Sequence, residues 1–134
     1  MYNEEETIGT VVTMALKYVD AVICIDDGSS DSSARIAEAC GAIVVRHRIN
    51  RGYGGALKSL FIKAREINAD ALVVLDSDGQ HEASDIPRLL TPILDGDHDF
   101  VIGSRFIDGG GGTDMPAYRR LGIKVITAAS NLSR

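Results

Sequence analysis

The sequence predicts a single α/β domain over residues 1–134, with a three-layer, doubly wound and mostly parallel sheet. Two apolar runs of five residues, 21–25 and 71–75, are each followed directly by acidic residues. Uninterrupted apolar runs of this length are typical of strands that are buried on both faces of a parallel sheet. Patterns of helical period lie between the runs, as the crossovers between parallel strands require.

The first predicted element is a helix over residues 4–18, in which apolar residues recur at helical spacing. Asn3, with Glu6 three residues later, resembles a capping box at its start. The apolar run 21–25 follows and is predicted to be the first strand. This helix should therefore pack on one face of the sheet.

The next stretch predicts a βαβ unit and a further helix. A helix over 32–40 is closed by Gly41, a residue that readily ends helices, and is followed by a strand over 42–45. Apolar residues at helical spacing over 56–67 predict a second crossover helix. This helix leads into the strand predicted at 71–75.

The last part of the chain predicts further elements of the same kind. Ser84 is expected to cap a helix that tolerates Pro87 in its first turn. A short strand over 100–103, a glycine-rich loop at 109–112 and a last helix over 118–132 follow. With 134 residues and a hydrophobic content of 45%, the chain is long enough to bury a core.

Acidic side chains follow both of the apolar runs. Asp26 and Asp27 come directly after 21–25, and Asp76 and Asp78 come directly after 71–75. In open α/β sheets ligands bind outside the carboxyl ends of the strands, so both acidic ends are expected at one rim. Mg²⁺ and Mn²⁺ prefer carboxylate oxygens, and Mg²⁺ commonly adds substrate phosphates. We therefore predict a site for a metal and a diphosphate; Asp-rich turns without a ligand are the alternative.

Charge and cysteine content narrow the class of protein. The net charge of −5 argues against a nucleic-acid partner. The basic stretch 46–51 is interpreted as a solvated loop, with phosphate contact as the alternative. Cys24 and Cys40 lack metal-ligand spacing and are interpreted as small buried hydrophobes in a reducing compartment. Without a signal peptide or a membrane-spanning run, we expect a cytoplasmic location, at the cytoplasmic face of a membrane in a longer protein.

Five short motifs follow one another along the chain. They are Tyr2-Asn3-Glu4-Glu5, Ile25-Asp26-Asp27-Gly28-Ser29, Asn50-Arg51-Gly52-Tyr53-Gly54, Asp76-Ser77-Asp78-Gly79-Gln80-His81 and Gly103-Ser104-Arg105-Phe106. In this order they resemble the family 2 glycosyltransferases, most closely the dolichyl-phosphate mannosyltransferase-like branch. The resemblance covers essentially the whole chain. It implies the glycosyltransferase A fold and transfer of a hexose, with inversion, from a GDP- or UDP-sugar to an acceptor, with Mg²⁺ or Mn²⁺.

The resemblance also implies where the nucleotide binds. Tyr2 and Glu4 would contact the base and the ribose, and Ile25 and Asp27 would line the same pocket. Carboxylates suit this task, because they accept hydrogen bonds from ribose hydroxyls and base N–H groups. These four residues are therefore expected to bind the nucleotide part of the substrate.

The remaining motifs imply the metal and diphosphate site. Asp76, the backbone of Ser77 and Asp78 match the family's metal and diphosphate motif, with Asp78 the better candidate for direct coordination. Gln80 matches a position that also approaches the metal or the donor. Arg105 would place its planar guanidinium group beside the diphosphate. Asp78, Gln80 and Arg105 are thus the expected catalytic residues.

The acceptor determines whether a base is needed. A lipid phosphate, the expected polyprenyl (dolichyl) acceptor, is already an anionic nucleophile, whereas a sugar hydroxyl would need a base within hydrogen-bond reach. His81 adjoins the acidic motif, and we expect it to orient a neighbour rather than to act as that base.

Both ends of the chain depart from the family pattern. Members begin with an apolar strand just before the Tyr-Asn-Glu motif, whereas here Tyr2 directly follows Met1. Loss of that central strand is expected to leave unpaired backbone groups on its two neighbours, unless the gap closes or another segment fills it. A homodimer that completes the sheet is one hypothesis. Members also continue beyond Arg134 through an acceptor-binding part, so the domain is expected to be incomplete.

Three other functions remain as alternatives. A non-catalytic fragment that binds nucleotide-sugars fits the same motifs. A haloacid-dehalogenase-like phosphatase would use the Asp-x-Asp-Gly of residues 76–79, but its two acidic motifs come in the other order along the chain. A dinucleotide-binding module is less favoured, because the glycines at 52–55 follow a charged loop and lack the third fingerprint glycine.

Overall fold

The structure is a computed structural model that describes residues 1–104, of which Met1–Val101 form one compact unit. In chain order its elements are α1 (Ile8–Ala15), β1 (Ile23–Asp26), α2 (Ser33–Ala39), β2 (Ile43–Arg46), α3 (Gly52–Glu66), the 3-10 turn η1 (Ala83–Asp85) and α4 (Ile86–Leu94). The loop expected at 109–112, the helix expected at 118–132 and Arg105 lie outside the described residues.

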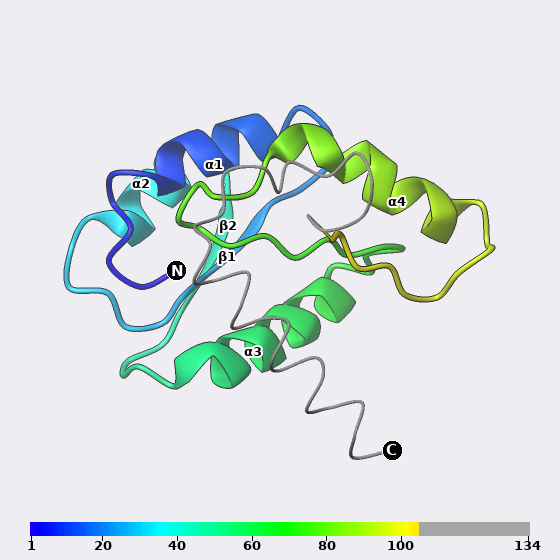
Figure 1. The fold of residues 1–134 in the computed structure, drawn as a ribbon. Coiled ribbons are helices and arrows are strands. Elements are labelled where there is room, and N and C mark those ends of the chain that lie inside the picture. The colour runs from blue at the N-terminus through cyan, green and yellow to red at the C-terminus, as the bar shows by residue number, and fades with distance from the viewer. Residues whose placement is uncertain (105–134) are drawn as a thin grey trace, which may run out of the picture. The chain divides into compact units, whose positions relative to one another are not determined.

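The elements form three layers, as predicted. Figure 1 shows α1, α2 and α4 on one side of the two strands and α3 on the other. Helix α3 packs against β1, and α2 packs against β2. Within the part of the chain that the structure describes, no helix is both long and apolar enough to cross a bilayer.

The βαβ unit predicted around residue 40 is confirmed. β1 and β2 are parallel, and their register pairs Ile23 with Ile43 and Asp26 with Arg46. The crossover helix α2 ends just before Gly41, which has a φ of +95°, a left-handed conformation that favours glycine. Glycine at this position lets the chain turn directly from α2 into β2.

The core consists of two clusters of small and branched side chains. One contains Ile8 and Val12 of α1 with Cys24 of β1, together with Ala37 and Ala42. The other cluster is Ala15, Ala83 and Ile86, with Val22 and Leu75 among the residues packed against it. Since α1 contributes to both clusters, it holds the sheet against η1 and α4.

The strand predicted at 71–75 is absent as a hydrogen-bonded strand. In the described residues the sheet contains only β1 and β2, and the run 71–75 makes no backbone–backbone hydrogen bond. Val73 and Leu75 still pack, partly buried, beside Ile86, whereas Val74 is 40% exposed. The burial on both faces that the apolar pattern predicted is therefore not found, because a strand also needs a neighbour and a cavity separates this run from β1.

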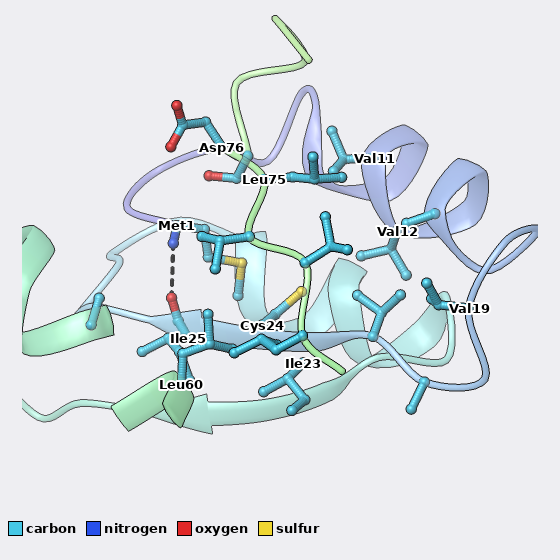
Figure 2. Close-up of a pocket in the computed structure, with 18 of the residues that line it drawn as sticks. Met1, Val11, Val12, Val19, Ile23, Cys24, Ile25, Leu60, Leu75 and Asp76 are labelled. Carbon is cyan, nitrogen blue, oxygen red and sulfur yellow. Dashed lines mark hydrogen bonds between the residues drawn. The ribbon is translucent and has the colours of Figure 1, made fainter. Parts of the chain in front are cut away.

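The edge of β1 that faces this cavity has a single backbone partner. Alternate residues of a parallel strand direct their backbone groups to opposite sides, and β2 occupies one side. On the other side the amino group of Met1 donates to the carbonyl oxygen of Ile25 at 2.8 Å, and the Asp27 N–H donates to the carbonyl oxygen of Met1 at 3.0 Å (Figure 2). Within residues 1–104 this pair of bonds occupies only the carboxyl end of the edge.

Several predicted boundaries were wrong for local reasons. α1 begins at Ile8 rather than residue 4, because Asn3 has a φ of +55° and its side chain accepts from the Ser30 N–H instead of capping a helix. The N-cap of α4 is Asp85 rather than Ser84. The strand expected at 100–103 is also absent among the residues described, since that stretch has no neighbouring strand.

Candidate functional site

A cavity of about 870 Å³ lies between β1 and the segment that follows α3. Its wall includes every substrate-binding residue expected from the sequence, together with the acidic residue at position 78. These residues are Tyr2, Glu4, Ile25, Asp27, Asp76, Ser77 and Asp78. Figure 2 shows Asp76 and Leu75 on one side of the cavity and Ile25 on the other. The structure therefore places the acidic end of β1 and the acidic loop after the run 71–75 at one cavity, with an apolar interior behind them.

Asp26 and Asp27 face different environments. Asp26 accepts a hydrogen bond from the Ser29 N–H at 3.0 Å and does not line the cavity. Asp27 does line it, although only 4% of the residue is exposed. The two neighbouring carboxylates therefore have different roles. Asp26 stabilises the turn after β1, and Asp27 presents its carboxylate to the cavity.

The Asp27 carboxylate is held ionised by its neighbours. Its Oδ1 lies 2.6 Å from His47 Nδ1 and accepts the Arg51 N–H at 2.9 Å. Burial raises the pKa of Asp27, but the hydrogen bonds from His47 and from the backbone of Arg51 and Gly52 outweigh it, so the pKa lies below its usual value. At neutral pH this group can only accept hydrogen bonds, as contact with a base or a ribose requires.

His47 is buried, so the interpretation of stretch 46–51 as a solvated loop was wrong for this residue. It is 8% exposed, and its Nε2 lies 2.8 Å from Ser59 Oγ of α3. The interpretation holds for Arg48, which is exposed, but Arg46 is the last residue of β2, and its side chain pairs with Glu38 at the surface. The position of His47 directly after β2, level with Asp27 after β1, was the available sequence signal.

The segment that carries Tyr2 and Glu4 is fastened to the loop before α2. Five hydrogen bonds link residues 3–5 to residues 29–33 through backbone N–H groups: Asn3 to Ser29 Oγ, Glu4 to Ser33 Oγ, Glu5 to Asp31 Oδ2, Ser30 to Asn3 Oδ1, and Ser32 to Glu5 Oε2. The Glu4 bond is the shortest, at 2.7 Å, and Ser33 is fully buried. These bonds place Tyr2 and Glu4 at the cavity, and Tyr2 remains 51% exposed.

The acidic loop 76–81 is shaped by its own backbone and by α1. Thr7 Oγ1 donates to the carbonyl oxygen of Ser77 at 2.7 Å. Asp78 Oδ1 accepts the Gln80 N–H at 2.9 Å. The Asp76 N–H donates to His81 Nδ1 at 3.2 Å, and that ring nitrogen lies 3.9 Å from Asp76 Oδ2. His81 thus contacts the acidic motif from outside the cavity.

The donor set at this loop fits a hard divalent cation that is shared with a ligand. Asp76 and Asp78 both line the cavity, and the Asp76 side chain is 55% exposed. No group of three or more His, Cys, Asp or Glu side chains suited to a metal occurs among residues 1–104. Two carboxylates with remaining positions for phosphate and water are the usual arrangement for Mg²⁺. Gln80, the third predicted ligand, is exposed and does not line the cavity.

Comparison with known proteins decides the family. The family model for glycosyl transferase family 2 matches residues 1–132. The chain belongs to this family. The family 2 assignment confirms the resemblance seen in the five motifs, and it disfavours the phosphatase and dinucleotide-binding alternatives.

Named relatives of this family 2 chain act on polyprenyl phosphates. It is 32% identical to the UDP-N-acetylglucosamine–dolichyl-phosphate N-acetylglucosaminyltransferase of Methanococcus voltae, over 90% of this chain and 55% of that protein. It is 33% identical to the undecaprenyl-phosphate mannosyltransferase of Micrococcus luteus, over 90% of this chain and 51% of that protein. The chain therefore spans about half the length of these relatives.

A solved structure supports the fold. The glucosyl-3-phosphoglycerate synthase of Mycobacterium tuberculosis superposes with a TM-score of 0.56 at 31% identity, over 70% of this chain and 38% of that one. The predicted glycosyltransferase A fold is thereby confirmed for this family 2 domain.

Proposed function

We propose that this domain takes part in transferring a hexose, with inversion, from a nucleotide-diphospho-sugar to a polyprenyl phosphate. One observation carries the proposal: Asp27, which follows β1, and Asp76 and Asp78, which follow the apolar run 71–75, line the same cavity. Carboxylates that line one site suit a ligand that brings cations and hydrogen-bond donors. A metal–diphosphate pair with an attached nucleoside supplies both.

The nucleoside is proposed to occupy the end of the cavity near Met1. There the exposed ring of Tyr2 offers a surface for stacking on a base. Glu4 and Asp27 supply carboxylate oxygens that accept from ribose hydroxyls or from base N–H groups. Either UDP or GDP is compatible with these contacts.

The diphosphate is proposed to lie beside the acidic loop. When the nucleoside diphosphate departs, negative charge develops on its β-phosphate; Mg²⁺ or Mn²⁺, held by Asp76 and Asp78, would supply Lewis-acid stabilisation there. Gln80 steadies Asp78 through its backbone N–H. Arg105, from the motif that follows, is proposed to add a guanidinium group to the same phosphate oxygens.

The acceptor is proposed from the relatives. Two of them carry dolichyl or undecaprenyl phosphate in their names. Such a phosphate attacks as an anion and needs no base, so His81 is left to hold the Asp76 N–H. We place the reaction at the cytoplasmic face of a membrane, where a lipid acceptor and a nucleotide-sugar can meet.

A second candidate is donor binding without turnover. The observation that favours it is the open edge of β1, where Met1 makes the single backbone pairing in the described residues. A homodimer that covers this edge is proposed as a route to a complete sheet. Analytical ultracentrifugation that shows only monomers at high protein concentration would contradict the dimer.

The test is calorimetric titration with UDP-glucose and GDP-mannose, each with Mn²⁺ and with EDTA. We expect metal-dependent binding of one nucleotide-sugar, lost in Asp78→Ala and kept in Asp97→Asn, an exposed acid outside the cavity wall. Transfer to a short polyprenyl phosphate then separates an enzyme from a binding domain. No binding of either donor by the folded chain would sink the proposal.

A further inference from the structure

Three polar side chains are linked into a chain of hydrogen bonds beside the cavity; Asp27 and His47 are buried, and Ser59 is partly buried. Asp27 follows β1, His47 follows β2 and Ser59 lies in α3. His47 Nδ1 is 2.6 Å from Asp27 Oδ1, and His47 Nε2 is 2.8 Å from Ser59 Oγ. The chain therefore connects the carboxyl ends of both strands to the helix on the other face of the sheet.

The chemistry of the three groups sets the direction of each hydrogen bond. An ionised carboxylate only accepts, so His47 Nδ1 must carry the hydrogen that faces Asp27. In a neutral ring Nε2 is then the acceptor, and the Ser59 hydroxyl donates to it. With this tautomer each ring nitrogen has one suitable partner, which agrees with the absence of unbonded buried side-chain N or O atoms among the described residues.

The hydrogen-bonded order Asp–His–Ser is also that of a catalytic triad with a serine nucleophile, but the geometry does not support a nucleophilic role for Ser59. A nucleophile must reach the substrate, and Ser59 does not line the cavity, although its helical neighbours Leu57 and Leu60 do. Asp27, at the opposite end of the chain, does line it. The chain of hydrogen bonds therefore presents a carboxylate rather than a hydroxyl.

We propose that His47 is a positioning residue for the donor: it holds the Asp27 carboxylate in one orientation, ready to accept from a base N–H or a ribose hydroxyl, and Ser59 fixes the ring. This proposal rests on the proposed function, in which Asp27 contacts the nucleoside. Both of the bonds that Asp27 receives from His47 and Arg51 end on Oδ1, which restricts rotation of the carboxylate. A ligand then finds its acceptor already oriented, without an entropic cost of ordering it.

The test compares nucleotide affinity in His47→Ala and His47→Asn. The asparagine amide can replace the Nδ1–H donor to Asp27, whereas alanine cannot. Because hydrogen bonds to charged groups contribute about 1.5–3 kcal/mol, we expect His47→Ala to weaken binding about 10- to 100-fold. We expect His47→Asn to recover most of that loss and Ser59→Ala to cost about 3-fold or less. Equal losses in the alanine and asparagine variants would overturn the positioning role.

Two further measurements test the role of His47 separately from its effect on fold stability and from the identity of the bound nucleotide. In a double-mutant cycle, Asp27→Ala should remove the effect of His47→Ala on affinity, because His47 acts through Asp27. Nitrogen-15 spectra of the wild-type imidazole should show the Nδ1–H tautomer; the Nε2–H tautomer would overturn the proposal even if nucleotide binds. A wild-type chain that shows this tautomer but binds neither UDP nor GDP would overturn the proposed function and, with it, the role of Asp27 as a donor contact.

Discussion

Thr7 Oγ1 donates a 2.7 Å hydrogen bond to the carbonyl oxygen of Ser77, so the first turn of α1 supports the acidic loop. Thr7 is the N-cap residue of α1, yet its hydroxyl caps no helical N–H. A hydroxyl has one hydrogen to donate, and Ser77 is the nearest acceptor, because Glu4 Oε2 lies at 3.2 Å. The bond joins residues that are 70 positions apart in the sequence, and it holds the loop that carries Asp76 and Asp78 beside the cavity.

We expect Thr7→Val to weaken metal-dependent donor binding, because the acidic loop loses its support while the side-chain volume is kept. Loss of one hydrogen bond of this kind costs about 1 kcal/mol, which corresponds to roughly fivefold in affinity. Thr7→Ser retains the hydroxyl and should bind like the wild type. Calorimetric titration with Mn²⁺ checks both variants, and an unchanged affinity in Thr7→Val would contradict the supporting role.

Acid should destabilise the fold partly through Asp27. Its folded pKa lies below the unfolded value, because hydrogen bonds from His47 and the Arg51 and Gly52 backbone outweigh the opposing effect of burial. The unfolded chain therefore binds more protons, so this stability is complete above about pH 4 and is lost as the pH falls through the folded pKa. Urea unfolding between about pH 2 and pH 6 should show a smaller dependence on pH in Asp27→Asn than in the wild type.

Asp31 provides the comparison for that experiment. Burial raises its pKa, but the hydrogen bonds from Ser33 and Glu5 outweigh this, and the pKa again lies below its usual value. Asp31→Asn should therefore also reduce the pH dependence of stability. Curves for Asp27→Asn and the wild type that stay parallel throughout would refute the assignment.

Ile86 should be the most costly apolar residue to truncate near α4. It is 1% exposed and packs with Ala15 and Ala83 where α1 meets η1. Ile86→Ala is expected to lower the free energy of unfolding by about 2–5 kcal/mol, because it removes apolar contacts and leaves a cavity. The matched control is Leu94→Ala at the end of the same helix, since Leu94 is 65% exposed and should cost below about 0.5 kcal/mol. Denaturant titration compares the two.

The two cysteines should differ in reactivity. Burial is the main cause that raises the pKa of Cys24 to about 11, so its thiolate is scarce at neutral pH. Cys24 is 8% exposed, whereas Cys40 is only partly buried. With a thiol reagent at pH 8, the first equivalent should modify Cys40, and Cys24 should react after unfolding. Peptide mapping identifies the order, and early modification of Cys24 would contradict its burial.

Local patterns predicted the first half of the fold well, because β1, α2 and β2 are consecutive elements of one βαβ unit. The strand expected at 71–75 failed because a strand is defined by its neighbour, and the apolar run 71–75 contains no information on whether that neighbour is present. The burial expected of the run is also incomplete, because Val73 and Leu75 are only partly buried and Val74 is exposed.

In the candidate site, too, features set by local sequence were predictable, and features that depend on distant residues were not. Asp27, Asp76 and Asp78 were predictable because each follows an apolar run, and the carboxyl ends of parallel strands share a rim. For His47 the sequence offered only its place directly after β2; its burial was not predictable, because it involves Ser59, which approaches from a helix on the opposite face of the sheet. Thr7 had no sequence signal, because its acceptor is a backbone carbonyl oxygen far along the chain.

The run 71–75 is held to the rest of the unit by side-chain packing and by the hydrogen bond from Thr7 to Ser77, which lies just after the run. No backbone–backbone hydrogen bonds join it to another of the described residues. Local opening in proteins begins where few backbone hydrogen bonds resist it. We therefore expect the amides of 71–75 to exchange with deuterium much faster than those of β1 in the unliganded chain. A nucleotide-sugar that contacts Asp27 at one end and Asp78 at the other would connect β1 to the run 71–75 across the cavity. Ligand binding would then slow exchange along the whole run 71–75, which lines the same cavity.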